Sequence, residues 1–511
     1  MSETSRSSKR IAKNTMLLYV RMLLLMAVTL YTSRVVLNAL GVDDFGIYNV
    51  VGGVVTMFSI LSASLSTAIS RFITYELGKG NIEKLKNIFS TAVTIQIILA
   101  TIIILIAETI GLWFLNIKMN IPIERIEAAN WTFQFSIITF VINLISVPYN
   151  AAIIAHEKMS AFAYISILEA ILKLSIAFLI VVSPIDKLIF YACLICSISL
   201  IIRFIYGYYC KLHFKECIYS FYWNKSLLKQ MFGFAGWNFI GSSSALLRDQ
   251  GGNILINLFF GPAVNAARGI AFQVNTATQN FVTSFMMAIN PQITKSYAAG
   301  NYDYMMQLIF KGGRFSFYLL LILTLPIFLN TNYILKLWLG IVPEHTVEFI
   351  RLILIFTLSE SISQPLITAQ HATGRIRNYQ IIVGGLQMMN LPIAYLTLKN
   401  GTDPEAIFII AIFISQVCLM ARLWMMKTSI KLSPSIFFSK VYLNILKVCL
   451  IAIILPISLS FKASDSITFF ILSSIIVIIY TTLIILFVGC NKDERIFIFS
   501  KIHNILIRKK M

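Results

Sequence analysis

The 511-residue sequence has few charged residues: Asp, Glu, Lys and Arg make up 13% of it, whereas 58% of it is hydrophobic. A soluble protein of this size needs more polar surface, so the composition excludes a soluble enzyme and a disordered chain. Seven cysteines are too few for a secreted disulfide scaffold of this length. The mean hydropathy of +0.81 indicates a chain that crosses a membrane many times.

Motifs of enzyme catalysis are also missing. The sequence contains no phosphate-binding loop and no G-x-S-x-G nucleophile elbow. The five histidines are scattered, and Cys193 and Cys196 form a CxxC spacing in an apolar run without a second pair. That isolated spacing is typical of packing rather than of metal binding. We therefore expect no enzyme activity, no cofactor and no metal.

Apolar runs of roughly 20 residues, each long enough to cross the hydrocarbon core as a helix, recur along the chain. Fourteen spans are predicted, at residues 15–37, 46–70, 88–115, 129–154, 161–183, 186–209, 231–258, 264–290, 308–330, 347–370, 378–398, 404–426, 440–461 and 467–490. The first run is too long for a signal peptide, so it is taken as a span. The loops are short, so any activity must lie within the membrane bundle. The predicted fold class is all-α, a polytopic membrane protein.

The net charge of +20 is unevenly distributed along the chain. When successive loops are assigned in turn to the two sides of the membrane, 29 of the 42 Lys and Arg fall on the side of both termini and only seven fall on the other side. Cytoplasmic loops carry the Lys/Arg excess, so both termini are predicted to be cytoplasmic. The basic C-terminal tail is expected to face anionic lipid, with no nucleic acid as partner.

The two halves of the sequence resemble each other at a constant offset. Segments 41–81 and 261–301 share ten identities, including Gly41/Gly261 and the Gly-Asn pairs at 80–81 and 300–301. The repeat unit is six spans in one orientation, which predicts an N-lobe (1–229), a C-lobe (230–430) and a segment 431–511 with two extra spans and a basic tail. Parallel repeats of this kind place substrate in a cleft near the midplane.

Three stretches carry a family resemblance: TSRVVL at 32–37, LGVDDFGIY at 40–48 and NPQITK at 290–295. The chain resembles the polysaccharide-exporter branch of the multidrug/oligosaccharidyl-lipid/polysaccharide (MOP) superfamily, and most of all the O-antigen and capsule flippases (Wzx-type). The resemblance covers essentially the whole chain and implies a MATE-like fold. It also implies flipping of an undecaprenyl-diphosphate-linked oligosaccharide across the bacterial cytoplasmic (inner) membrane. Surface polysaccharides such as lipopolysaccharide would be the product, with glycosyltransferases and a polymerase as partners.

The six Lys and Arg that are assigned to neither side of the membrane lie inside predicted spans, where each costs about 3 kcal/mol or more if it faces lipid. Lys447 is close enough to a helix end to snorkel, and Lys173 has Glu169 four residues before it as an ion-pair partner. Arg34 lies near the outer end of its span, where snorkelling and lining the outer mouth are equally favoured. No such explanation accounts for the remaining three, which are Arg21, Arg248 and Arg268.

One predicted span, 264–290, carries a polar stripe at helical spacing. Its members are Asn265, Arg268, Asn275, Thr276, Gln279, Thr283 and Asn290. Interhelical hydrogen bonding would explain some of them, but seven on one face favour a wet cavity. Because Arg pairs with diphosphate through a planar fork and amides suit sugar hydroxyls, an anionic glycan lipid is the expected cargo. The candidate substrate-binding residues are Arg21, Arg34, Arg248, Arg268, Asn275 and Gln279.

Carboxylates inside the spans are few. Asp249 and Glu360 are the candidates for coupling transport to protons or sodium, although Asp249 is equally well explained as a neutraliser of a neighbouring Arg. The external pair Asp43-Asp44 is expected to be a solvated turn.

Two other functional classes fit the sequence less well. A MATE-type multidrug/cation antiporter favours acidic cavities and twelve spans, whereas here three intramembrane arginines outnumber the plausible acids. A membrane polymerase or glycosyltransferase generally needs a large external loop or an acidic metal-binding motif, and the sequence has neither.

Overall fold

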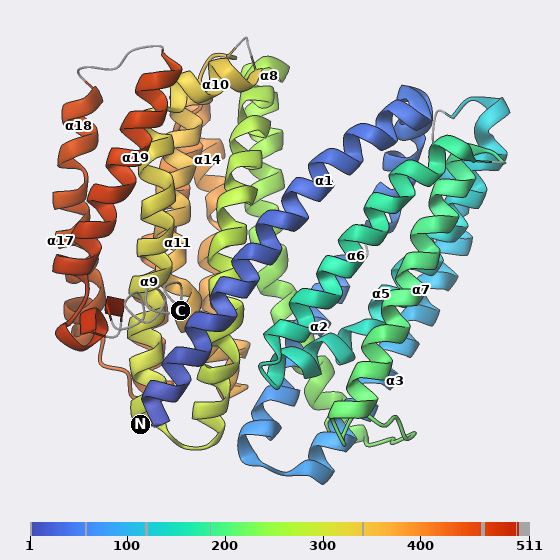
Figure 1. The fold of residues 1–511 in the computed structure, drawn as a ribbon, viewed down its shortest axis with the longest axis horizontal. Coiled ribbons are helices and arrows are strands. Elements are labelled where there is room, and N and C mark those ends of the chain that lie inside the picture. Colours follow the sequence, from blue (N-terminus) through green and yellow to red (C-terminus); the bar gives the residue numbers. More distant parts are fainter. Residues whose placement is uncertain are drawn as a thin grey trace, which may run out of the picture. The chain divides into compact units, whose positions relative to one another are not determined.

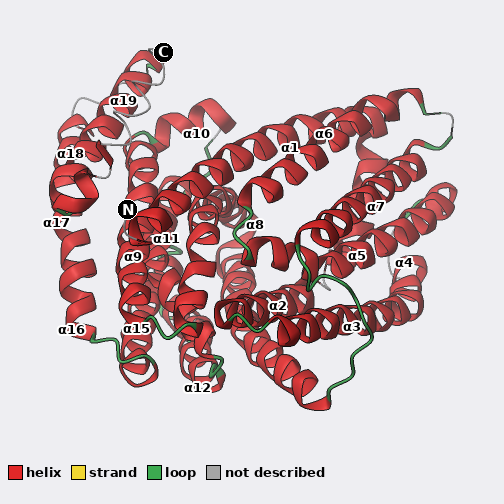
Figure 2. Cartoon of the chain, turned by 60° about the horizontal axis from the view of Figure 1, so that its bottom comes forward, coloured by secondary structure: helices red, strands yellow, loops and turns green. Residues whose placement is uncertain are grey.

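The computed structural model describes residues 3–56, 59–117, 121–183, 185–339, 342–460, 466–496 and 498–499. Within these ranges the chain is helical almost throughout and contains no β-strand (Figure 2). Ten helical stretches of the described chain are long and apolar enough to span a membrane. The other four predicted spans fall on α1 (Glu3–Thr56), α2 (Ser59–Lys79) and the two halves of α8 (Lys225–Ala298). The predicted all-α polytopic fold is confirmed.

The chain forms two compact units, each described here by itself. Unit 1 comprises residues 1–243 and 287–301, and unit 2 comprises 244–286 and 302–511, so that α8 contributes to both. Besides α1, α2 and parts of α8, unit 1 contains α3 (Ile82–Ile106), the π-turn η1 (Ala107–Gly111), α4 (Leu112–Ile117), η2 (Ile123–Arg125), α5 (Ile126–Ala155), α6 (Met159–Leu179), η3 (Ile180–Val182) and α7 (Lys187–His213). The lobe boundaries at 229 and 430 stay a prediction.

Unit 2 is built from the middle of α8 and from all the elements that follow residue 301. These are α9 (Tyr302–Leu329), α10 (Thr331–Leu339), α11 (Thr346–Thr373), α12 (Arg377–Tyr379), η4 (Gln380–Gly384), α13 (Gly385–Met388), α14 (Asn390–Lys399), α15 (Ala406–Ser429), α16 (Pro434–Phe437), η5 (Phe438–Tyr442), α17 (Leu443–Ala452), α18 (Ile454–Ser460), α19 (Ile467–Ile484) and η6 (Ile485–Gly489).

Within unit 1, α5, α6 and α7 lie side by side, and α5 also packs against α2 and α3 (Figure 1). Close approach depends on small residues: a Cβ added to Gly111 would lie 2.7 Å from the Phe133 ring of α5. Phe133 is fully buried, and its large apolar area makes it an anchor of this packing. In unit 2, α11 packs against both α9 and α15, and α19 packs against α9.

The Gly-Asn pair at 80–81 has a clear structural role. Gly80 has a φ of 75°, the left-handed conformation that ends a helix, and therefore terminates α2. The Asn81 side chain then accepts a 3.0 Å hydrogen bond from the Lys84 N–H and caps the start of α3. Gly300, its counterpart in the second half, also has a φ of 75°.

The breaks within the two long helices α1 and α8 also follow the sequence repeat. Gly41 interrupts α1 with φ 81° and ψ 170°, and Gly261 interrupts α8 with φ 81° and ψ −175°. These values lie in a backbone region open essentially to glycine alone. The repeat seen in the sequence is therefore also present in the backbone, at the same offset.

Replacing Gly261 by alanine is expected to lower the free energy of unfolding by about 2 kcal/mol, within the range for a residue forced into this region. A Cβ at Gly261 would meet nothing within 4 Å, so backbone strain alone would cause the loss. Thermal unfolding of the purified protein in detergent measures it. Gly269→Ala is the control: Gly269 is helical and equally open, so alanine there should be neutral or stabilising. Equal midpoints for the two variants would contradict the assignment.

Candidate functional site: an arginine cavity in unit 2

Two arginines of α8 meet a single aspartate in unit 2. The Arg248 Nε donates a 2.8 Å hydrogen bond to Asp249 Oδ1, which makes an ion pair. The Arg268 Nη2 donates a 2.6 Å hydrogen bond to the backbone carbonyl of Asp249. Three residues singled out from the sequence are thus brought together, although positions 249 and 268 lie on opposite sides of the break at Gly261.

Both guanidinium groups also lie over aromatic rings. The Arg268 Cζ is 4.2 Å from the Phe272 ring centre, and the Arg248 Cζ is 4.8 Å from that of Phe356. Arg268 is only 5% exposed, and its buried Nε has no hydrogen-bond partner among the described residues. A buried cation with a vacant donor is costly unless an anion or water completes its bonding.

Gly252 leaves the room that Arg268 occupies, since a Cβ there would lie 3.0 Å from the Arg268 Nη2. The cavity beside these groups has a volume of about 30 Å³ and is lined further by Asn275, Asn390 and apolar residues of α11, α14 and α15. That volume suits a water molecule or two and is too small for a sugar. Admission of a larger anion would require these helices to separate.

Of the other candidates of unit 2, Asn275 lines the same cavity, whereas Gln279 and Glu360 do not. Asn275 Oδ1 accepts a 2.6 Å hydrogen bond from the Thr357 hydroxyl of α11, which ties α8 to α11 beside the cavity. Gln279 is half-buried further along α8 and is not among the residues that line this cavity. Glu360, one turn beyond Phe356, accepts a 2.6 Å hydrogen bond from the Ser415 hydroxyl of α15.

The remaining predicted residues belong to unit 1. Arg21 in α1 lies with its Cζ 4.5 Å from the Phe162 ring of α6, and its buried Nε has no hydrogen-bond partner within the described chain. The Lys173 amine pairs with Glu169 at 2.7 Å, which confirms the expected ion pair. Arg34 falls in α1, but its side chain lies outside the described part of the structure.

Sequence reasoning missed a buried arginine in unit 2. Arg422 is not among the six intramembrane basic residues that the sequence singles out, yet it is 2% exposed inside α15. Its Nε donates to the Tyr379 hydroxyl at 3.1 Å and its Nη1 to the Ser363 hydroxyl at 2.9 Å. Its position inside the predicted span 404–426 was the available signal.

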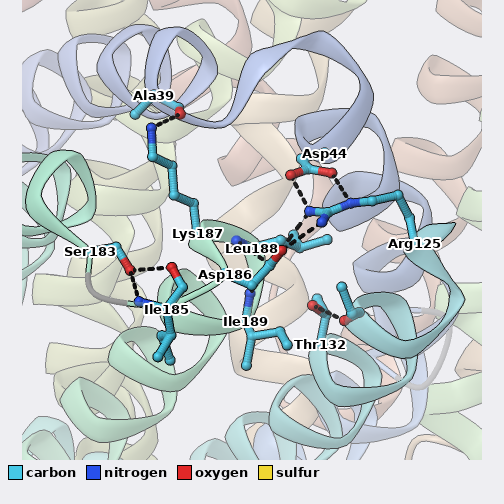
Figure 3. A network of polar contacts seen from close by, with 11 residues as sticks. Ala39, Asp44, Arg125, Thr132, Ser183, Ile185, Asp186, Lys187, Leu188 and Ile189 are labelled. Carbon is cyan, nitrogen blue, oxygen red and sulfur yellow. Dashed lines mark hydrogen bonds and ion pairs between the residues drawn. The ribbon is translucent and has the colours of Figure 1, made fainter.

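The expectation of a solvated turn was wrong for Asp44. In unit 1 the Arg125 Nε donates to Asp44 at 2.8 Å, and the Arg125 Nη1 donates to Asp186 at 2.5 Å (Figure 3). Asp186 also caps α7 by accepting the N–H groups of Leu188 and Ile189. The side chain of Asp43 lies outside the described part.

A related pair occurs in unit 2. His345 Nδ1 lies 2.6 Å from Glu405 Oε1. At the offset of the repeat, His345 corresponds to Arg125, and Glu405 is next to the position that corresponds to Asp186. All four residues immediately precede a helix, so both halves join the same two helix starts by a polar pair.

The NPQITK stretch is held by a buried carboxylate of unit 1. Glu157, in the turn between α5 and α6, accepts hydrogen bonds from Lys295 Nζ at 2.9 Å and from Gln292 Nε2 at 2.6 Å. The same turn carries His156, which lies opposite another carboxylate, Glu216. Burial raises the pKa of Glu216, but the hydrogen bond with His156, a backbone hydrogen bond and the charge of His156 together outweigh burial, so that the pKa lies below its ordinary value.

Comparison with known proteins agrees with this architecture. The family model described as "Polysaccharide biosynthesis protein" matches residues 11–297, and the model described as "MatE" matches residues 252–396. The chain is therefore a multi-pass membrane protein of the MOP superfamily. Within that superfamily it belongs to the polysaccharide biosynthesis protein family, because the first match covers more than half of its length. The superfamily expected from the sequence is confirmed.

Individual relatives are distant. The chain is 19% identical over 326 residues to "Uncharacterized membrane protein EpsK" of Bacillus subtilis (strain 168); the match covers 62% of this chain and 63% of the relative. Among solved structures, an outward-facing multidrug resistance MATE family transporter has a TM-score of 0.73 at 13% identity, covering 84% of this chain and 98% of that chain. A MOP superfamily transporter from Pyrococcus furiosus, described as having a "reverse polarity of binding pocket", has a TM-score of 0.72 at 14% identity with the same coverages.

Proposed function

We propose that this protein flips an undecaprenyl-diphosphate-linked oligosaccharide across the bacterial cytoplasmic membrane by alternating access, for surface polysaccharide synthesis. The observation that carries the proposal is the arginine cavity. The buried guanidinium group of Arg268 and the partly buried one of Arg248 line it against one carboxylate, Asp249. Such a site attracts an anion, and the diphosphate is the strongest anion of this cargo. Membership in the polysaccharide biosynthesis protein family supports a glycan as the other part of the cargo.

The bonding of the two arginines suggests how the site would work. Arg268 keeps one vacant donor, whereas the Arg248 Nε is occupied by Asp249. An incoming diphosphate would complete the bonding of Arg268 first and then compete with Asp249 for Arg248. Release of the Asp249 carboxylate would leave it free to take a proton or a cation, which couples cargo to ion. Glu360, hydrogen-bonded to Ser415, is the second coupling candidate.

Reconstitution provides the direct test. Proteoliposomes loaded with labelled undecaprenyl-diphosphate-oligosaccharide in one leaflet should expose the glycan to a membrane-impermeant hydrolase on the other side. In cells, a deletion strain should accumulate lipid-linked repeat units and lose surface polysaccharide. Unchanged polysaccharide together with no glycan exposure in vesicles would refute the proposal.

A multidrug/cation antiporter is the second candidate. It is favoured by the match of residues 252–396 to the MatE model and by the MATE transporters among the structural neighbours. Asp249 and Glu360 would then bind the cationic drug instead of a coupling ion. Expression in a drug-sensitive host separates the two functions: lower drug accumulation with normal glycans would establish the antiporter.

A further inference from the structure

A second cavity of unit 2, of about 500 Å³, lies away from the arginine cavity. It lies between α9 and the segments that follow the sequence repeat, which lie beside α9 (Figure 1). Its polar lining includes Lys311 and Arg314 of α9, Lys440 of η5, Asn444 of α17, and Asn491 and Asp493 just after η6. None of these residues lines the arginine cavity.

The wall of this cavity is built by specific bonds. Arg314 is 5% exposed and donates to the Gly489 carbonyl at 3.1 Å and to Glu494 Oε1 at 2.6 Å. The buried Tyr318 hydroxyl donates to Asn444 Oδ1, which leaves the Asn444 N–H groups available as donors. Two π-turns, η5 and η6, adjoin the cavity, and π-turns inside helices frequently occur at functional sites.

The charge of the lining is not balanced by pairing. Glu494 is engaged by Arg314, but no carboxylate of the described chain lies within 4.0 Å of the Lys311 or Lys440 amine. Lys440 instead lies with its amine 5.8 Å from the Phe310 ring centre. Asp493 is the other acid in the lining. Two lysines and three amides, Gln307, Asn444 and Asn491, thus line a cavity large enough for a phosphate ester.

We infer that this cavity binds the phosphate headgroup of an anionic phospholipid, in the leaflet on the side that the Lys/Arg distribution assigns to the cytoplasm. Basic pockets between membrane helices on that side are suited to anionic headgroups. The helices next to the cavity expose large apolar residues against which acyl chains can pack, such as Leu446 (45% exposed), Leu450 (61%) and Phe487 (58%). The lysine stems reach the headgroup level along this apolar surface.

Purified protein in neutral detergent provides the test, with thermal unfolding as readout. Short-chain phosphatidylglycerol should stabilise the protein, whereas short-chain phosphatidylcholine and inorganic phosphate should not. In the variant Lys311→Gln/Lys440→Gln the apparent affinity for phosphatidylglycerol should fall roughly fivefold for each lysine removed. Asp493→Asn should raise that affinity.

Lys427→Gln is the matched control, because Lys427 is an exposed lysine of unit 2 that does not line the cavity. It should respond to phosphatidylglycerol like the parent. An unchanged response in the double variant would overturn the inference. Equal stabilisation by inorganic phosphate would show that the site takes the free ion and not a lipid. Glycan transport enters none of these measurements, so failure here and failure of the proposed function are distinguishable.

Discussion

Replacing Arg268 by alanine is expected to reduce glycan flipping by about 100-fold. The loss is that of one partner of a buried, hydrogen-bonded charge pair, here the pair that Arg268 would form with the diphosphate of the cargo. Arg268 is the buried cation of the arginine cavity whose Nε remains without a partner in the described chain. The alanine variant removes the fork that would bind the diphosphate. Arg268→Lys keeps the charge but loses the fork, so it should fall between the parent and the alanine variant. Vesicle flipping measured at equal protein levels provides the comparison.

Arg351→Ala is the matched control for this experiment. Arg351 lies in α11 of the same unit, packs with its Cζ 5.4 Å from the Phe328 ring centre and does not line the arginine cavity. Its loss should leave flipping close to the parent rate. Normal flipping by the Arg268→Ala protein would remove Arg268 from the site.

The second large effect is expected on stability. Replacing Glu157 by alanine should lower the free energy of unfolding by about 3 kcal/mol, because it removes one partner of a buried ion pair. The Glu157 side chain is 3% exposed and receives bonds from Lys295 and Gln292. Gln292 is itself 4% exposed, so its amide would lose an acceptor out of reach of water. Thermal or denaturant unfolding in detergent measures the change.

Two variants make this prediction specific. Glu157→Gln keeps an acceptor for Gln292 but loses the charge opposite Lys295, so a smaller destabilisation is expected. Glu124→Ala removes an exposed glutamate of the same unit, in η2, and should be nearly neutral. Indistinguishable unfolding of the Glu157→Ala and Glu124→Ala proteins would contradict the structural role given to Glu157.

The membrane-spanning fold could be predicted because span length and loop charge leave strong, local patterns. The repeat was also visible, since Gly41 and Gly261 occupy a conformation that selects glycine. The pairing of Arg248 with Asp249 was accessible from their adjacency. The partners of Asp44 and Glu157 were not, because Arg125 and Lys295 lie 81 and 138 residues further along the chain. Periodicity describes one helix at a time and does not identify its neighbour.

The small size of the arginine cavity affects any binding measurement. Cargo can enter only those molecules in which the surrounding helices have opened, so the open fraction scales the measured affinity. Each tenfold decrease in that fraction raises the apparent dissociation constant about tenfold, even when the contacts of Arg248 and Arg268 are unchanged. A weak equilibrium affinity would therefore measure how rarely the cavity opens as much as how well it recognises an anion.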